Sequence, residues 1–159
     1  MNSSAHDDLM ISFATPDAAQ FKTLRDDCGW GKLPLAHAQA ALLGSLMTVS
    51  HYDGKTLVGF GRAVGDGILN VYIQDVIVSP LYRGRGLGDA IVQKLISRLT
   101  RTLPESATVG LLAARGKAGF YTRHGFQMRP GPTTDGGMSA TAGRLLSAQT
   151  AMAKRSAQV

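Results

Sequence analysis

The segment from Asp75 to Asp89 combines a strand-like run, a turn of alternating glycines and arginines, and the start of an amphipathic helix. The first amide groups of a helix have no acceptor within the helix and lie at the positive end of its dipole, so they can bind an anion. Glycines let such a backbone approach its ligand closely. Arg83 or Arg85 could add charge-assisted hydrogen bonds, each worth about 1.5 to 3 kcal/mol. This pattern predicts a binding site for a phosphate or diphosphate group.

Two common phosphate-binding motifs do not fit this segment. A P-loop requires a Lys-Ser/Thr pair after its glycines, and no such pair follows here. A dinucleotide-binding turn requires a third glycine or alanine, but Asp89 or Ile91 occupies that place. A plain glycine turn with solvated arginines is the remaining alternative, although three alternating glycines and two arginines exceed what such a turn requires.

The residues resemble a known family at two places. Arg83–Gly88 resembles the R/Q-x-x-G-x-G/A signature of the GNAT acetyltransferase superfamily, and the strand-like run before it resembles the family's fourth strand. Phe120–Phe126 is similar to the family's F-Y-x-x-x-G-F segment, in the family's order and at its usual separation. The resemblance covers about residues 9–142, and it implies that the chain binds acetyl-CoA and its product CoA.

The resemblance also implies which residues contact acetyl-CoA. The backbone of residues 76–78 would pair with the pantetheine arm like an added strand, and the turn before the helix would hold the diphosphate. The family often has asparagine where this chain has Ala114, and a small residue where it has Lys117. The expected cofactor-binding residues are Val76, Ile77, Val78, Arg83, Gly84, Arg85, Gly86, Leu87, Gly88, Asp89 and Lys117.

Acetyl transfer to an amine requires a neutral nitrogen, and two side chains are candidates for the proton transfers. An amine with a pKa of about 10.4 is deprotonated to only about one part in a thousand near neutral pH, a handicap of about 4 kcal/mol. Asp75 interrupts an apolar strand, so it is a base acting through water, an anchor for a cationic amine, or a bulge carboxylate bonded to neighbouring backbone. Tyr121 is the residue that the resemblance implies as general acid for the leaving thiolate.

Trp30 is the candidate for contact with the acceptor. It follows Asp26 and Asp27 on a loop that resembles the acceptor-side wall of the family. The ring and the nearby carboxylates could hold a cation, and a hydrophobic plug is the alternative interpretation. Residues 1–55 carry six acidic and four basic side chains, which favours a small cationic amine as the acceptor.

The composition excludes several classes of protein. The chain has 159 residues, 44% of them hydrophobic, and a net charge of +6, which fits one globular domain. Its single cysteine, Cys28, allows no internal disulfide and its four histidines are scattered, so we expect no metal site and a cytoplasmic location. No apolar run is long enough to span a membrane. The basic side chains form no long run and have no interleaved aromatics, so we do not expect nucleic acid as a partner.

Hydrophobic periodicity and turn residues define the elements that must position this site. Helices are expected from Thr15–Pro16 to about Asp27 and over residues 35–43, 86–99 and 118–124. Strands are expected over residues 46–51, 56–64, 69–78, 108–113, 126–128 and 138–142. After residue 143 the sequence has a modest tendency to form a helix. This order predicts a mixed α/β (α+β) fold. The resemblance implies a GNAT-like, mostly antiparallel sheet of six to seven strands, splayed between the fourth and fifth strands and flanked by about four helices.

These observations lead to one hypothesis with several alternatives. We expect a flexible N-terminus at residues 1–8, an acetyltransferase domain at residues 9–143 and a C-terminal tail at residues 144–159. The hypothesis is an N-acetyltransferase that moves an acetyl group from acetyl-CoA directly to a primary amine of a small molecule. The alternatives are an enzyme acting on protein amines or an amino-sugar phosphate, and a non-catalytic module that binds CoA or nucleic acid. The resemblance also implies a homodimer.

Overall fold

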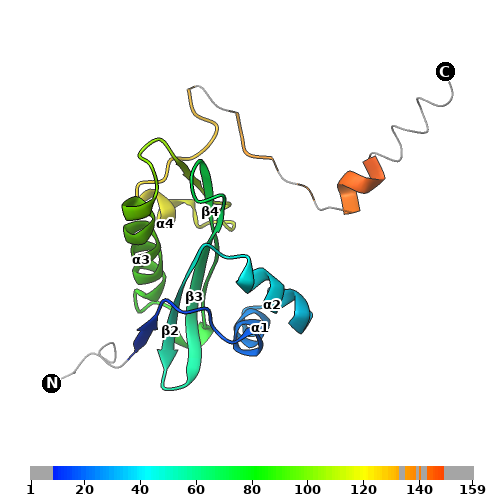
Figure 1. Cartoon of the computed structure of the whole chain (residues 1–159), viewed down its shortest axis with the longest axis vertical. Helices are drawn as coiled ribbons and strands as arrows, with labels where there is room; N and C mark the ends of the chain where they lie inside the picture. The colour runs from blue at the N-terminus through cyan, green and yellow to red at the C-terminus, as the bar shows by residue number, and fades with distance from the viewer. Residues whose placement is uncertain (1–8, 133–134, 139, 141–142, 149–159) are drawn as a thin grey trace. The chain divides into compact units, whose positions relative to one another are not determined.

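A computed structural model describes residues 9–132, 135–138, 140 and 143–148 (Figure 1). The described residues up to His124 form one compact unit, and those from Gly125 onward form a second. In the second unit residues 143–148 are helical, whereas residues 126–128 form no strand, so that strand prediction is wrong. Prolines at positions 130 and 132 follow this stretch and have no N–H to donate to a strand partner. The strand predicted at residues 138–142 lies partly outside the described residues.

The first unit is built around a five-stranded sheet with the order β1-β2-β3-β4-β5. The strands are β1 (Met10–Ser12), β2 (Met47–Asp53), β3 (Thr56–Gly65), β4 (Asn70–Val78) and β5 (Thr108–Gly110). Neighbouring strands are antiparallel except β4 and β5, which are parallel. The predicted mixed, mostly antiparallel sheet is confirmed, with five described strands rather than six to seven.

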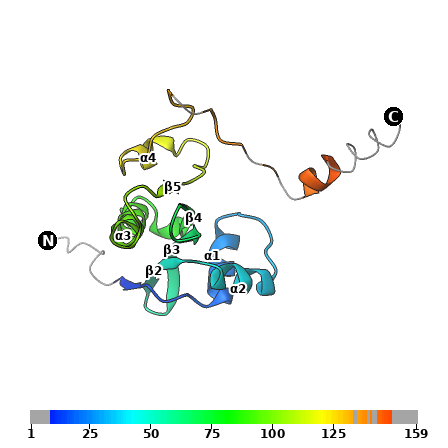
Figure 2. The same cartoon turned by 45° about the horizontal axis from the view of Figure 1, so that its top comes forward.

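Helices lie on both faces of this sheet. Figure 2 shows α1 (Ala18–Asp27) and α2 (Leu35–Leu43) on one side of the strands and α3 (Leu87–Thr102) on the other. A short 3-10 turn (Pro80–Tyr82) connects β4 to α3, and α4 (Ala118–Thr122) follows β5. The four α-helices of the first unit agree with the number expected to flank the sheet.

The first helix begins later than the Thr15–Pro16 pattern indicates. Asp17 is the residue that caps α1, because its carboxylate accepts hydrogen bonds from the amides of Ala19 and Gln20. Phe21, one turn into the helix, is buried against Phe60 of β3, with ring centroids 4.9 Å apart. The cap and this contact together fix α1 against the sheet.

The hydrophobic stripe predicted for α3 is confirmed. Leu87, Ile91, Leu95 and Leu99 are all buried, and the helix continues to Thr102. Burial of each such side chain contributes about 1.5 to 3 kcal/mol. The stripe therefore holds the N-terminus of α3 firmly next to the end of β4.

β4 and β5 pair over three residues and then part. Residues 70–72 of β4 align with residues 108–110 of β5. Residues 73–78 keep β3 as their antiparallel partner, but no described strand pairs with them on the side of β5. Residues 111–113, which were predicted to continue the strand, leave the sheet instead. The splay that the family resemblance implied is therefore present.

A β-bulge interrupts β4 within this unpaired stretch. Phe60 and Arg62 of β3 stand opposite Ile77 and Gln74, so two steps along β3 match three along β4. Asp75 has a φ of 51°, in the left-handed region that residues other than glycine seldom adopt. The bulge turns the Asp75 carboxylate out of the regular alternation of the strand.

Gly61 lies opposite the bulge, where α3 crosses β3, and it has no room for a side chain. A Cβ there would lie 2.5 Å from Ile91 Cγ2 and 3.2 Å from Leu95 Cδ1. We expect Gly61→Ala to lower the free energy of unfolding by about 1 to 3 kcal/mol in urea denaturation, because α3 must shift to accept the methyl group. Gly119→Ala is the control, since a Cβ there meets nothing within 4 Å. Equal losses in the two variants would contradict this packing.

Candidate active site

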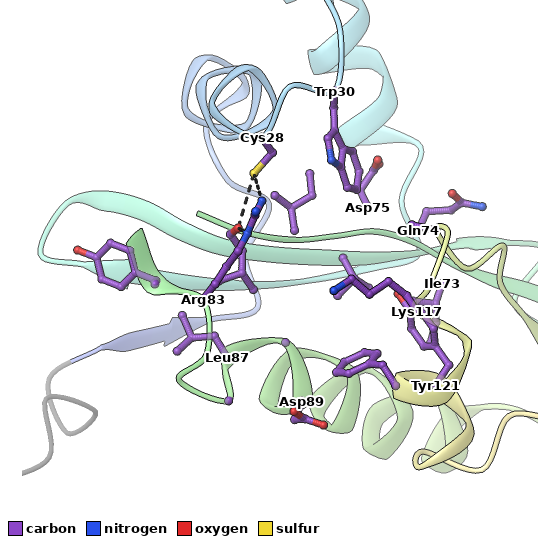
Figure 3. Close-up of a pocket in the computed structure, with 18 of the residues that line it drawn as sticks. Cys28, Trp30, Ile73, Gln74, Asp75, Arg83, Leu87, Asp89, Lys117 and Tyr121 are labelled. Carbon is purple, nitrogen blue, oxygen red and sulfur yellow. Dashed lines mark hydrogen bonds between the residues drawn. The ribbon is translucent and has the colours of Figure 1, made fainter. Parts of the chain in front are cut away.

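A cavity of about 580 Å³ opens where β4 and β5 part (Figure 3). Its walls come from β4, the loop after α1, the turn before α3, the residues after β5, and α4. Every site residue predicted from the sequence lines this cavity except Arg85. The structure thus gathers residues from position 30 to position 121 around one space.

The unpaired edge of β4 forms one wall of the cavity. Val76, Ile77 and Val78 line it and have no described strand on that side. Strand edges of this kind bind extended ligands that carry amide groups, because the backbone offers donors and acceptors at regular intervals. A ligand with amide groups, about as long as a short peptide, could therefore pair with this edge of β4 like an additional strand.

The N-terminus of α3 lines the same cavity and has no side-chain cap. Gly84 and Gly86 have φ values of 73° and 78°, and these left-handed conformations carry the chain into the helix. The first main-chain hydrogen bond of the helix runs from Ala90 N to Gly86 O at 3.0 Å. The amides of residues 87–89 lie at the positive end of this 16-residue helix. They suit an anion with several oxygens.

Asp89 brings a carboxylate into this first turn, and side chains from the end of α4 balance its charge. His124 Nε2 lies 3.0 Å from Asp89 Oδ1, and Arg123 Nη2 lies 3.6 Å from the same oxygen. The His124 side chain is only 7% exposed, whereas that of Asp89 is 42% exposed. These contacts connect the end of α4 to α3, and the Arg123 guanidinium offsets part of the repulsion that Asp89 would exert on a bound anion.

The two arginines of the turn lie in different places. Arg83 lines the cavity, where its Nε donates to Val78 O at 3.2 Å and its Nη2 donates to Cys28 Sγ at 3.5 Å (Figure 3). Arg85 does not line the cavity, and its guanidinium carbon lies 5.2 Å from the centroid of the Tyr82 ring. Of the two, only Arg83 therefore contributes its charge to the lining of the cavity.

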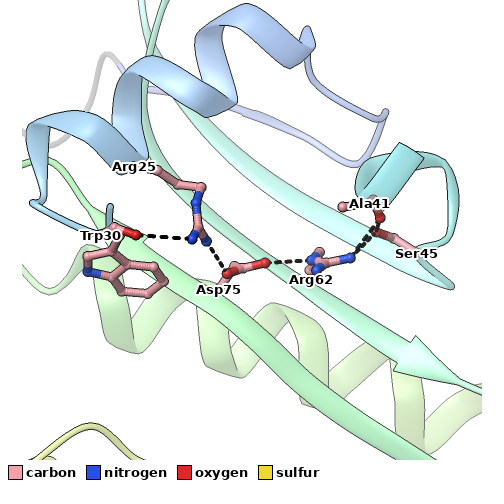
Figure 4. Close-up of polar contacts among 6 residues, drawn as sticks. All are labelled: Arg25, Trp30, Ala41, Ser45, Arg62 and Asp75. Carbon is pink, nitrogen blue, oxygen red and sulfur yellow. Dashed lines mark hydrogen bonds and ion pairs between the residues drawn. The ribbon is translucent and has the colours of Figure 1, made fainter. Parts of the chain in front are cut away.

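Asp75 is joined to two arginines in the middle of the cleft (Figure 4). Its Oδ1 accepts from Arg25 Nη1 and its Oδ2 accepts from Arg62 Nε, both at 2.7 Å, and its side chain is 13% exposed. Arg62 also donates to the carbonyl of Ala41 at 2.7 Å, which connects the carboxylate to the end of α2. The bulge that the sequence allowed is present, but arginines rather than backbone groups bind its carboxylate.

Trp30 lies beside this cluster and is 42% exposed. Arg25 Nη2 donates to Trp30 O at 3.4 Å, and the Arg25 guanidinium carbon lies 5.3 Å from the centroid of the Trp30 ring. The sequence predicted a cation on this ring, and the chain itself supplies one. Asp26, which was expected to help hold a substrate cation, pairs with Lys22 instead.

Tyr121 lines the cavity from α4 and is half-buried. Burial raises the pKa of its phenol above the ordinary value of about 10, so the hydroxyl stays protonated at neutral pH. Phe120 packs edge-on against the ring, with centroids 4.9 Å apart. A protonated phenol held in this way can donate a hydrogen bond to an anion that develops in the cavity.

Several lining residues were not predicted from the sequence, and neither was the pairing of Asp75 with Arg25 and Arg62, although Arg62 stood out as a charge in an otherwise apolar strand. The missed lining residues include Cys28, Ile73, Gln74, Leu112 and Phe120. Arg25 and Arg62 lie 50 and 13 positions from Asp75, and no periodic pattern connects such distant charges. In the part of the chain that the structure describes, no three His, Cys, Asp or Glu side chains form a metal-binding group, and no helix is long and apolar enough to cross a membrane.

Comparison with known proteins agrees with this geometry. A family model described as an acetyltransferase (GNAT) domain matches residues 44–128, which is more than half of the chain. The chain belongs to the GNAT acetyltransferase family. Members of this family use acetyl-CoA as co-substrate, and the uncapped turn before α3 and the open edge of β4 suit its diphosphate and its amide-containing arm.

Individual relatives support the family assignment. The uncharacterized N-acetyltransferase ycf52 of Pyropia yezoensis is 35% identical over 115 residues, which are 70% of this chain and 65% of the relative. Histone acetyltransferase TAP1 of Glycine max is 33% identical over 125 residues, which are 72% of this chain and 53% of the relative. The GNAT chain thus spans less than two thirds of the length of these two relatives.

Solved structures match more completely. A GNAT family acetyltransferase from Streptococcus pneumoniae TIGR4 has a TM-score of 0.70 at 25% identity, covering 84% of this chain and 98% of that protein. A protein of unknown function from meticillin-resistant Staphylococcus aureus has a TM-score of 0.75 at 28% identity, with the same coverage. Both agree with the mixed sheet and flanking helices described above.

The ion pairs of Asp75 generate a test of its role. We expect Asp75→Asn to lower the free energy of unfolding by about 2 to 4 kcal/mol in urea denaturation, because two largely buried guanidinium groups lose their shared counter-ion. Asparagine tolerates the left-handed backbone, so the change isolates the charge.

Asp26→Asn is the matched control, because the Lys22–Asp26 pair is 36% and 39% exposed and should contribute less than about 1 kcal/mol. If Asp75→Asn kept full stability and lost only turnover, Asp75 would be a base rather than a structural residue.

Proposed function

We propose that this GNAT protein transfers the acetyl group of acetyl-CoA to the nitrogen of a primary amine. The observation that carries the proposal is the junction of two features in one cavity. The unpaired edge of β4 ends where the uncapped N-terminus of α3 begins, so an extended amide chain and its diphosphate would find adjacent sites. A thioester at the far end of that chain would then lie near Asp75 and Tyr121.

The cofactor contacts expected from the sequence are kept in this proposal. The amides of residues 84–89 and the Arg83 side chain bind the diphosphate, and the backbone of residues 76–78 binds the pantetheine arm. Lys117 lines the cavity and adds positive charge for the cofactor's phosphates or carbonyls. Arg85 contributes less, because it stacks on Tyr82 outside the lining of the cavity.

The proposed reaction is direct attack without a covalent enzyme intermediate. The neutral amine nitrogen attacks the thioester carbonyl carbon, so a C–N bond forms, the C–S bond breaks, and the nitrogen releases one proton to water. Tyr121 donates a hydrogen bond and then its proton to the departing sulfur, so CoA leaves as the free thiol, and the phenolate regains a proton from water. Because burial raises the pKa of this phenol, proton transfer from Tyr121 to a thiolate costs more than about 2 kcal/mol. Tyr121 therefore first stabilises the sulfur by donating a hydrogen bond, and the proton transfer follows.

Asp75 has a positioning role in this proposal rather than that of a base. Both of its oxygens accept charge-assisted hydrogen bonds from guanidinium groups, so the carboxylate is already engaged by two cations of the same chain. The carboxylate instead orients Arg25 and Arg62, which hold the Trp30 loop and the end of α2. The amine therefore enters in its neutral form and loses its proton to water after attack.

The acceptor of the acetyl group, the cellular location and the oligomeric state of the protein are proposals. The names of relatives point to two kinds of acceptor, a histone for TAP1 of Glycine max and serotonin for serotonin N-acetyltransferase 2 of Oryza sativa, 38% identical over 73 residues. Acetylation of protein amines or an amino-sugar phosphate, and CoA or nucleic-acid binding without catalysis, stay as alternatives. A cytoplasmic location, a homodimer and the absence of a metal stay predictions from the sequence.

Two substitutions separate cofactor binding from catalysis. We expect Arg83→Ala to weaken acetyl-CoA affinity about tenfold in titration calorimetry, because one charge-assisted hydrogen bond is lost, while turnover at saturating acetyl-CoA changes little. Tyr121→Phe should leave that affinity unchanged and lower kcat in an assay of thiol release. Because burial raises the Tyr121 pKa above 10, wild-type kcat should show no loss from tyrosine ionisation below about pH 10.

Arg85→Ala is the matched control and should change the affinity less than twofold, since Arg85 lies outside the lining of the cavity. Binding of acetyl-CoA without release of thiol in the presence of any amine would favour a CoA-binding module. Salt-sensitive binding to DNA with no binding of acetyl-CoA would favour the nucleic-acid module. Equal kcat in Tyr121→Phe and wild type would remove Tyr121 as the acid.

A further inference from the structure

The acidic side chains that line the cavity are already bound to cations of the same chain. In the described residues two acids line it, Asp75 and Asp89. Asp89 is held by His124 and Arg123 beside the cofactor turn. Asp75 is held at both of its oxygens by Arg25 and Arg62. A cationic group that enters this cavity therefore finds both carboxylates engaged.

The charge around Asp75 is positive. Arg25, Arg62 and Asp75 together carry +1, because two guanidinium groups surround one carboxylate. Lys117 adds a further positive charge to the lining, and Figure 3 shows it between Ile73 and Tyr121. Nearby like charges repel at the low effective dielectric of a cleft, and an unpaired ammonium loses hydration there as well. Each positive charge on the acceptor beyond the reacting amine is thus a disadvantage.

The acceptor end of the cavity exposes apolar surface rather than free negative charge. Trp30 is 42% exposed and Leu112 is 67% exposed, and both line the cavity together with Ile73. The Arg25 guanidinium, 5.3 Å from the ring centroid, already occupies one face of Trp30 at cation-binding distance. Arg25 therefore holds the ring in place, and the exposed remainder of the ring is free to pack against an apolar group.

We infer that the acceptor is a monoamine whose amino group is carried on an apolar or aromatic group, and that this group packs against Trp30. Polyamines and amino sugars with several positive charges are then poor acceptors. This inference rests on the proposed acetyl transfer and replaces the cationic acceptor expected from the acidic N-terminal half. No acidic side chain from described residues 9–55 lines the cavity, so that acidity does not reach the site.

Steady-state kinetics with three amines test the inference. We expect 2-phenylethylamine to have a kcat/KM at least tenfold above that of spermidine, with hexylamine between them because it is apolar but lacks a ring. An assay of thiol release at saturating acetyl-CoA measures all three. A higher kcat/KM for spermidine than for 2-phenylethylamine would overturn the inference.

Fluorescence gives a second readout that does not require turnover. Trp30 is the only tryptophan in the chain, so intrinsic emission reports on the acceptor wall alone. In the presence of CoA, 2-phenylethylamine should shift or quench this emission at concentrations at least tenfold below those required of spermidine. If 2-phenylethylamine changes the emission in this way but no acetyl transfer is detected, the acceptor site is supported and the proposed function is wrong. Emission that responds to neither amine, or to spermidine first, would overturn the inference.

Removing one of the two arginines that bind Asp75 should shift the preference among amines toward spermidine. Arg62→Gln removes one positive charge and frees Asp75 Oδ2, so the KM for spermidine should fall severalfold relative to that for 2-phenylethylamine. Arg62→Lys keeps the charge and is the matched control, with the wild-type preference retained. An unchanged preference in a folded Arg62→Gln variant would contradict the charge argument. If Arg62→Gln does not fold, the wild-type comparison of the three amines decides.

Discussion

The parting of β4 from β5 is the constraint on which the rest of the structure depends. Three residue pairs hold the two strands together, and beyond Tyr72 one edge of β4 has no described partner. Unpaired backbone groups in a folded protein need a partner, and an extended ligand with amide groups can supply it. The same parting opens the cavity to the N-terminus of α3, which the buried leucine stripe fixes at the end of β4. One interruption of the sheet thus leaves an open strand edge next to a helix N-terminus, which are the two features that the proposed cofactor site requires.

The bulge at Asp75 gives the other end of the cleft its chemistry. A left-handed residue in mid-strand places a carboxylate between Arg25 of α1 and Arg62 of β3, so two helices are tied to β4 through one charge. A lone carboxylate at this depth would carry a large desolvation cost, and the two guanidinium groups offset it. The cluster keeps a net positive charge and presents the Trp30 ring to the cavity. The proposed acceptor preference therefore rests on the same three side chains that tie these elements together.

Local patterns predicted most of the fold and the cofactor end of the site. The hydrophobic stripe of α3, the strands before it and the glycine turn are properties of short stretches, so spacing predicted an anion site at this turn and the family resemblance implied the cleft beside it. The acceptor end depends on tertiary contacts. Neither the pairing of Asp75 with Arg25 and Arg62 nor the position of Arg85 outside the cavity lining leaves a local signal. The acceptor expected from the acidic N-terminal half stays a prediction, and among described residues 9–55 no acidic side chain lines the cavity.

The most direct test of the account is an amide-resolved NMR titration of the protein with CoA. The account predicts that the largest shifts fall on the amides of Gly84 and residues 86–89, with smaller shifts along residues 76–78 of β4. The helix terminus would then be the diphosphate site, as its uncapped amides and left-handed glycines indicate. Saturable binding of CoA with those amides unmoved, and shifts confined to other basic parts of the chain, would contradict the account.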